Sequence, residues 1–91
     1  MFEIFFANDG VKKDYENLEE KIRARINGLI EILKDIPVPF RFFDVSKVAG
    51  RKNRFRIRIG KFRVIYHIEE SERRIYILQI EQKDETTYKH N

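Results

Sequence analysis

Polar and apolar residues alternate strictly in the middle of the chain. From residue 54 to residue 59, arginine occupies every even position and phenylalanine or isoleucine every odd one. Such alternation is typical of a β-strand with one buried and one solvated face. Gly60 and Lys61 then form a two-residue turn, and residues 62–68 form the returning strand. The pattern therefore predicts a hairpin with one apolar face and one face rich in guanidinium groups.

The turn at Gly60 and Lys61 also predicts the register of this hairpin. Across the two strands it pairs Ile59 with Phe62, Arg58 with Arg63, Ile57 with Val64, Arg56 with Ile65 and Phe55 with Tyr66. Like charges that lie directly opposite one another destabilise a sheet by some tenths of a kcal/mol or more. A chain that keeps Arg58 opposite Arg63 in spite of this cost is expected to bind an anion there. The rigid fork of arginine suits phosphate.

The first third of the chain shows a different period. Residues 2–6 are apolar enough for a buried strand, and a turn follows at residues 8–10. Between residues 11 and 36, apolar side chains recur at three- and four-residue steps, as on one face of a helix. One helix over residues 12–35 would be roughly 36 Å long, which exceeds the length of short strands. We therefore expect a break between Asn17 and Lys21, giving a helical hairpin.

The rest of the pattern completes an α+β prediction. Pro37 and Pro39 end the helical part, and residues 40–48 are a connector whose apolar side chains pack down onto the protein. Residues 74–81 are the last strand, and residues 82–91 are a polar tail. We predict one compact, two-layer α+β domain over residues 1–91. It consists of an N-terminal strand, a helical hairpin and a three-stranded antiparallel meander, with the helices on the apolar face.

Aromatic residues are assigned to the core of this domain. The predicted core aromatics, interpreted as packing residues and not as a base-stacking platform, are Phe2, Phe5, Phe6, Phe55 and Phe62. His67 is expected to share the face of Arg63, because four residues separate them along one strand.

Charge and composition then narrow the class of partner. The 91 residues carry a net charge of +4, and residues 47–63 contain eight lysines and arginines without an acidic residue. This concentration favours an anionic partner, above all nucleic acid. The chain has no cysteine, which excludes disulfides, thiolate metal sites and a cysteine nucleophile. It has no apolar run of about 20 residues and no signal-peptide pattern, so we expect a cytoplasmic protein.

Two segments together resemble a known family. Residues 43–50 read FDVSKVAG and residues 55–66 read FRIRIGKFRVIY. In spacing and residue type they resemble the RelE branch of the RelE/ParE toxin superfamily. Phe55 and Phe62 stand where the family usually has tyrosine, and Val48 stands where leucine is usual. A final hydrophobic strand and the late Tyr88 complete the likeness.

The resemblance implies a function and its partners. RelE-type toxins of type II toxin–antitoxin pairs cleave messenger RNA on the ribosome without a metal or another cofactor, and a RelB-like antitoxin silences them. The catalytic positions that the family implies are here Arg56, Arg58, Arg63, Lys83 and Tyr88. Lys83 is a departure, because the family has arginine after the last strand. Lysine keeps the charge and loses the bidentate geometry.

These residues suit a reaction in which the 2′-hydroxyl of the RNA attacks the adjacent phosphate. Arg63 would stabilise the charge that develops on the phosphate, and Arg56 or Arg58 would orient it. Tyr88 is expected either to accept the proton of the 2′-hydroxyl or simply to cover the edge of the sheet. The side chains expected to hold RNA phosphates without regard to sequence are Arg51, Lys52, Arg54 and Lys61.

Two alternatives remain open at the level of sequence. A ParE-like toxin that inhibits DNA gyrase would share the fold without cleaving RNA, and it would not need Arg63 together with Tyr88. A degenerate relative that only binds RNA or an antitoxin would be consistent with the missing late arginine.

Overall fold

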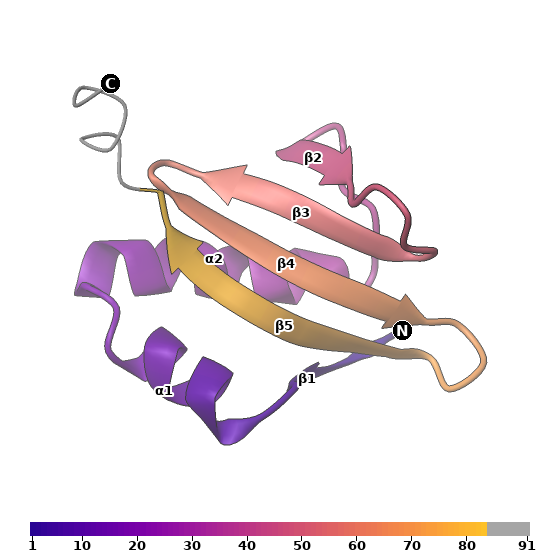
Figure 1. Cartoon of the computed structure of the whole chain (residues 1–91), viewed down its shortest axis with the longest axis horizontal. Helices are drawn as coiled ribbons and strands as arrows, with labels where there is room; N and C mark the ends of the chain where they lie inside the picture. Colours follow the sequence, from indigo (N-terminus) through magenta and orange to yellow (C-terminus); the bar gives the residue numbers. More distant parts are fainter. Residues whose placement is uncertain (84–91) are drawn as a thin grey trace.

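The computed structural model describes residues 1–83 and contains two helices beside a five-stranded sheet (Figure 1). In chain order the elements are β1 (Glu3–Phe6), α1 (Asp9–Glu16), α2 (Glu20–Leu33), β2 (Asp44–Lys47), β3 (Arg54–Ile59), β4 (Phe62–Glu69) and β5 (Arg74–Gln82). The strand order is β1-β5-β4-β3-β2, with β1 parallel to β5 and the other pairs antiparallel. The predicted α+β architecture is confirmed.

The helical hairpin breaks where its length predicted. Asn8 caps the start of α1, since its side-chain oxygen accepts a hydrogen bond from the Val11 N–H at 3.0 Å. At the other end, Arg23 of α2 donates hydrogen bonds to the carbonyl oxygens of Glu16 and Leu18, each at 3.1 Å. These bonds satisfy carbonyl groups that the end of α1 leaves without helical partners. A side chain of the second helix therefore stabilises the turn between the two helices.

The helices bury the apolar face of the sheet (Figure 1). Ile26, Leu29 and Leu33 of α2 are fully buried together with Ile57, Val64, Tyr66, Ile75 and Ile77 of the strands. Tyr66 also donates a hydrogen bond from its hydroxyl to the Pro37 carbonyl oxygen at 2.7 Å. This bond ties the segment after α2 to the centre of the sheet. Burial raises the pKa of the Tyr66 hydroxyl well above its usual range.

The β3–β4 hairpin has the register that its turn predicted. Ile59 pairs with Phe62, Arg58 with Arg63, Ile57 with Val64, Arg56 with Ile65, and Phe55 with Tyr66. Gly60 in the turn has a φ of 58°, a left-handed conformation that glycine adopts at little cost. The face of the sheet that carries Arg54, Arg56 and Arg58 is turned away from the helices, and we call it the open face.

The connector over residues 40–48 was predicted incorrectly in two respects. Its second half is the strand β2, which pairs with β3 and extends the antiparallel meander to four strands. Only Val45 in this strand packs against the core, so four residues gave too short an alternation to be recognised. In its first half, Phe40 and Phe42 are 69% and 63% exposed and do not pack down. Phe43 and Val45 do pack against the core.

One predicted core aromatic lies on the wrong side of the sheet. Phe2 is buried, and Phe6, Phe55 and Phe62 pack against the core. Phe5, however, is 38% exposed and stacks on Tyr76, with ring centroids 5.9 Å apart. The alternation of β1 places Phe5 on the open face, because its neighbours Ile4 and Phe6 pack against the core.

Within residues 1–83, no helix is long and apolar enough to cross a membrane.

Candidate nucleic-acid interface on the open face

Arg58 and Arg63 lie opposite one another on the open face, in directly paired positions of β3 and β4. Arg58 is exposed and Arg63 is half-buried. Between residues 1 and 83, no carboxylate lies within the 4.0 Å of an ion pair from Arg56, Arg58 or Arg63. Three guanidinium groups therefore share one end of the sheet without an ion pair to any residue between 1 and 83. We call this region, next to the Gly60–Lys61 turn, the hairpin end.

Two hollows adjoin at the hairpin end and share both arginines. The first, of about 240 Å³, is lined by Asp44, Ser46, Arg56, Arg58 and Arg63. The second, of about 200 Å³, is lined by Arg58, Gly60, Lys61, Phe62, Arg63 and Lys83. A tetrahedral anion on the shared arginines would contact both hollows, and arginine and lysine donors are the groups that bind phosphate oxygens most strongly.

The structure brings Lys83 to the arginine pair. Its backbone N–H donates to the Lys61 carbonyl oxygen at 2.7 Å, which continues the β4–β5 ladder beyond the end of β5. Lys83 and Lys61 therefore stand beside Arg58 and Arg63, as the lining of the second hollow shows. Tyr88, the remaining candidate from the sequence, lies outside the described residues.

The predicted RNA-binding residues divide into two groups. Lys61 belongs to the hairpin end, whereas Arg51 and Lys52 are exposed in the loop before β3. Arg54 pairs with His67 at the start of the hairpin. Four residues separate Arg54 from Arg58, which corresponds to roughly 13 Å along a strand. The structure therefore does not bring Arg51, Lys52 and Arg54 to the hollows at the hairpin end.

Two carboxylates flank the arginine pair, and sequence reasoning missed both. Asp44 of β2 pairs with Arg58, and Glu81 of β5 pairs with Arg63, so the row across the sheet is Asp44, Arg58, Arg63, Glu81. Glu81 is engaged, since its Oε2 accepts a hydrogen bond from Gln79 Nε2 at 2.8 Å. No hydrogen bond or ion pair joins the Asp44 side chain to another residue between 1 and 83. The only sign of this position in the sequence was the short alternation of Asp44, Val45 and Ser46, which is typical of a strand.

A further cation reaches the hairpin end from a helix. Arg25 of α2 places Nη1 only 3.3 Å from the point that a Cβ on Gly60 would occupy. The helical segment of the sequence gave no reason to connect Arg25 with the turn at residues 60–61. The connection arises because α2 packs across the sheet behind the hairpin (Figure 1).

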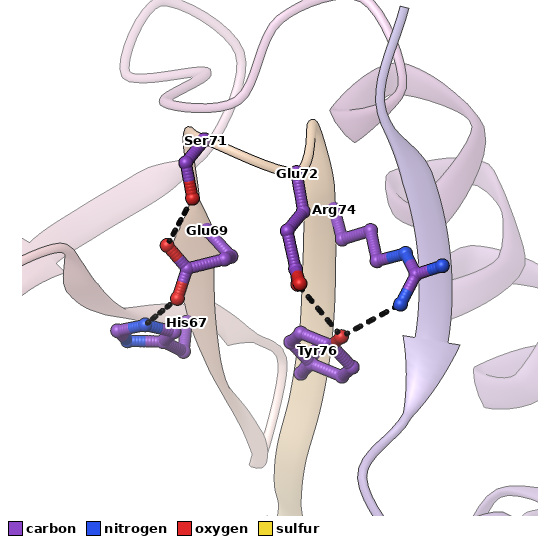
Figure 2. Close-up of polar contacts among 6 residues, drawn as sticks. All are labelled: His67, Glu69, Ser71, Glu72, Arg74 and Tyr76. Atoms are coloured by element: carbon purple, nitrogen blue, oxygen red, sulfur yellow. Dashed lines mark hydrogen bonds and ion pairs between the residues drawn. The ribbon is translucent and has the colours of Figure 1, made fainter.

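The opposite end of the open face, which we call the far end, holds two sets of polar contacts (Figure 2). His67 lies 3.9 Å from Glu69, and Ser71 donates to Glu69 at 3.2 Å. The Tyr76 hydroxyl donates to Glu72 and accepts from Arg74, both at 3.5 Å. The alternation of β4 puts His67 on the face of Arg63, as predicted. His67, Glu69, Glu72 and Arg74 thus contact partners within the protein. Arg54, which pairs with His67, differs, because its Nε is buried without a hydrogen-bond partner among residues 1–83.

The sequence matches a known protein family over most of its length. The family described as "ParE toxin of type II toxin-antitoxin system, parDE" matches residues 7–86. A protein of Methanocaldococcus jannaschii named "Putative toxin RelE1" is 38% identical over 74 residues, which cover 81% of this chain and 82% of that protein.

Two solved structures share the fold. RelE in the archaeal RelE–RelB complex from Pyrococcus horikoshii is 28% identical, with a TM-score of 0.81 over 92% of this chain and 97% of that chain. The isolated E. coli RelE toxin is 14% identical, with a TM-score of 0.76 over 99% of this chain and 95% of that chain. The chain belongs to the ParE toxin family of type II toxin–antitoxin systems and, within the RelE/ParE superfamily, to the RelE branch.

Proposed function

We propose that this protein is a ribosome-dependent endoribonuclease that cleaves messenger RNA by attack of a 2′-hydroxyl on the adjacent phosphate. The observation that carries the proposal is the pair Arg58–Arg63. The two guanidinium groups lie on directly paired positions of the open face, have no carboxylate partner between residues 1 and 83, and line two adjoining hollows.

The chemistry of the reaction matches these groups. The nucleophile belongs to the RNA, so the protein has to hold the phosphate, stabilise its additional negative charge and transfer protons. Preorganised donors aimed at a developing anion are worth about 3–4 kcal/mol each in other enzymes. We assign this role to Arg63 and Arg58, with Arg56 orienting the phosphate from the next position along β3. Lys83 adds an ammonium group at the second hollow.

Further residues are assigned to proton transfer and to RNA binding. Tyr88 remains a prediction as a proton acceptor, because it lies outside the described residues. Arg51, Lys52 and Arg54 would contact RNA phosphates further along the strand, and Lys61 those next to the cleaved bond. Since the proposed substrate is messenger RNA on the ribosome, the protein would act in the cytoplasm.

The proposed partner is a RelB-like antitoxin. The P. horikoshii relative forms a complex with RelB, and a RelE from M. jannaschii is likewise solved with RelB. We infer that a cognate antitoxin binds this chain and silences it. An acidic segment placed over the hairpin end would neutralise the arginine pair.

One observation favours a second candidate function. The matched family is described by ParE and parDE, and ParE-like toxins inhibit DNA gyrase without cleaving RNA. A gyrase inhibitor would not need Arg58 and Arg63 to hold a phosphate between them. The two functions therefore make different demands on the same two residues.

A translation assay separates these candidates. Purified ribosomes with a defined message are incubated with the wild-type protein, with Arg63→Ala, and with the control Arg74→Ala from the far end. We expect cleavage by wild type and by Arg74→Ala, and a strong loss in Arg63→Ala. The same preparations are added to a gyrase supercoiling assay. Intact message combined with inhibited supercoiling would establish the ParE-like function instead.

A further inference from the structure

Asp44 is the carboxylate that the fold places inside the first hollow. It stands on β2, directly opposite Arg58, and lines this hollow with Ser46, Arg56 and Arg63. Its side chain is exposed, and within residues 1–83 it makes no hydrogen bond or ion pair. A carboxylate that only neutralised Arg58 would be expected within 4.0 Å of its guanidinium group. The structure instead leaves Asp44 beside the arginines with its oxygens available to a ligand.

Asp44 and Lys83 lie on opposite sides of the arginine pair. The two hollows share Arg58 and Arg63, while Asp44 lines only the first and Lys83 only the second. A phosphate held by the shared arginines would therefore have a carboxylate on one side and an ammonium group on the other. In-line displacement at phosphorus requires this separation, because the attacking and leaving oxygens lie on opposite sides of the phosphorus atom.

We propose that Asp44, in place of Tyr88, is the catalytic proton acceptor for the 2′-hydroxyl, an inference that rests on the proposed ribonuclease function. The carboxylate takes the hydroxyl proton while O2′ forms a bond to phosphorus. The bond from phosphorus to O5′ breaks, its electron pair stays on O5′, and this oxygen takes a proton from the Lys83 ammonium group. The products are a 2′,3′-cyclic phosphate and a 5′-hydroxyl. Asp44 and Lys83 return to their starting states by exchanging one proton with water.

Glu81 offers a matched comparison within the same row. It pairs with Arg63 as Asp44 pairs with Arg58, so it carries the same charge at the corresponding position of the row. Its Oε2 accepts the hydrogen bond from Gln79, and it lines neither hollow. Glu81 therefore serves as a charge-matched control that does not line the hollows.

The test compares wild type, Asp44→Asn, Glu81→Gln and Tyr88→Phe on ribosome-bound message, with single-turnover cleavage and RNA affinity measured separately. Removal of either carboxylate takes away a repulsive charge, so both amide variants should bind RNA as tightly as wild type or tighter. The cleavage rate should fall by roughly 10²–10⁴-fold in Asp44→Asn and stay near wild type in Glu81→Gln. Asp44→Glu should restore part of the rate, because it returns a carboxylate to this position.

The pH profile supplies a second readout. In wild type the logarithm of the cleavage rate should rise with pH on the acid side with a slope near one, and Asp44→Asn should lose this limb. The assignment is overturned if wild type cleaves and Asp44→Asn retains a rate within about threefold, or if Glu81→Gln falls equally. It is also overturned if Tyr88→Phe alone removes the acid limb. Absence of cleavage by wild type would refute the proposed function itself, which keeps the two failures distinct.

Discussion

The two ends of the open face are built from the same strands and differ in how they treat charge. At the far end, polar and charged side chains contact one another: His67 lies 3.9 Å from Glu69, and the Tyr76 hydroxyl hydrogen-bonds both Glu72 and Arg74 (Figure 2). At the hairpin end, Arg58 and Arg63 face each other without an ion pair to any residue between 1 and 83. Exposed ion pairs add little stability, so folding alone does not explain either arrangement. The difference supports the proposal that the hairpin end binds an external anion.

Among the substitutions that test the difference between the two ends, Arg63→Ala should have the largest effect on cleavage. Loss of a preorganised donor at the phosphate should reduce ribosome-dependent cleavage by roughly 10²–10³-fold. The free energy of unfolding should change by less than about 0.5 kcal/mol, because no ion pair is lost and a like-charge contact is relieved. Single-turnover cleavage and urea unfolding of the same preparation measure both quantities.

The control for Arg63→Ala is Arg74→Ala at the far end, which removes the same side chain from a position where it contacts Tyr76 and lies over Phe5, 5.2 Å from the ring centroid. Its cleavage rate should equal that of wild type. If both variants lost activity equally, the contrast between the two ends would have no functional meaning.

The second prediction concerns the face of the sheet that packs against the helices. It measures what the hydrogen bond of Tyr66 contributes to the free energy of unfolding. Tyr66→Phe leaves the Pro37 carbonyl oxygen without the donor that lies 2.7 Å away. Loss of this part-buried hydrogen bond should lower the free energy of unfolding by about 0.5–1.5 kcal/mol. Cleavage should persist in the folded fraction, because the hydroxyl points to the segment after α2 and away from the open face. Chemical denaturation at neutral pH gives the value.

Tyr66 also predicts a dependence of stability on pH. Burial raises the pKa of its hydroxyl in the folded protein, so folding favours the protonated form. The associated stability is complete below the unfolded pKa of about 10 and is lost as the pH rises above it. Wild type should therefore lose more stability between about pH 9 and 11 than Tyr66→Phe does. If the free energy of unfolding depended on pH in the same way in both proteins, the pKa of this hydroxyl would not be raised by folding.

The third prediction compares the two ends by their contact with phosphate. Arg58→Ala should reduce the salt dependence of single-stranded RNA binding by about 0.7 in the slope of log K against log salt, the value for one lost phosphate contact. Arg74→Ala should leave this slope unchanged. Fluorescence anisotropy with a short single-stranded RNA over a range of salt concentrations measures both slopes. A larger change in Arg74→Ala would move the RNA path to the far end.

The sequence predicted the hairpin end because local rules determine it. A two-residue turn at Gly60 and Lys61 leaves one register, and this register alone places Arg58 opposite Arg63. The break between the helices was predictable from length, although the role of Arg23 in stabilising it was not. Local pattern is sufficient where a contact lies within a few residues of a turn.

The flanking groups were not predictable, because they depend on pairing between distant segments. Asp44 reaches Arg58 through a four-residue strand with one inward side chain, Val45, which carries too little periodic signal. Glu81 faces Arg63 because a bulge between β4 and β5 leaves Leu78 without a partner, as Ile65 pairs with Gln79 and Tyr66 with Ile77. The alternation of β5 alone does not reveal where this extra residue falls. The exposed position of Phe5 likewise follows from β1 joining the sheet next to β5.

The smallest expected effect tests whether the polar contacts at the far end are more than a neutral surface. Tyr76→Phe removes two contacts of 3.5 Å and keeps the ring that stacks on Phe5. Long, exposed hydrogen bonds contribute little, so the free energy of unfolding should fall by no more than about 0.5 kcal/mol, with unchanged cleavage. Urea unfolding beside a cleavage assay is sufficient for the measurement. A loss above about 1.5 kcal/mol would mean that these contacts stabilise the β4–β5 turn, and a loss of cleavage would extend the functional surface over the whole open face. The absence of both would locate the function of this face at the hairpin end, where Arg58 and Arg63 have no ion pair within residues 1–83.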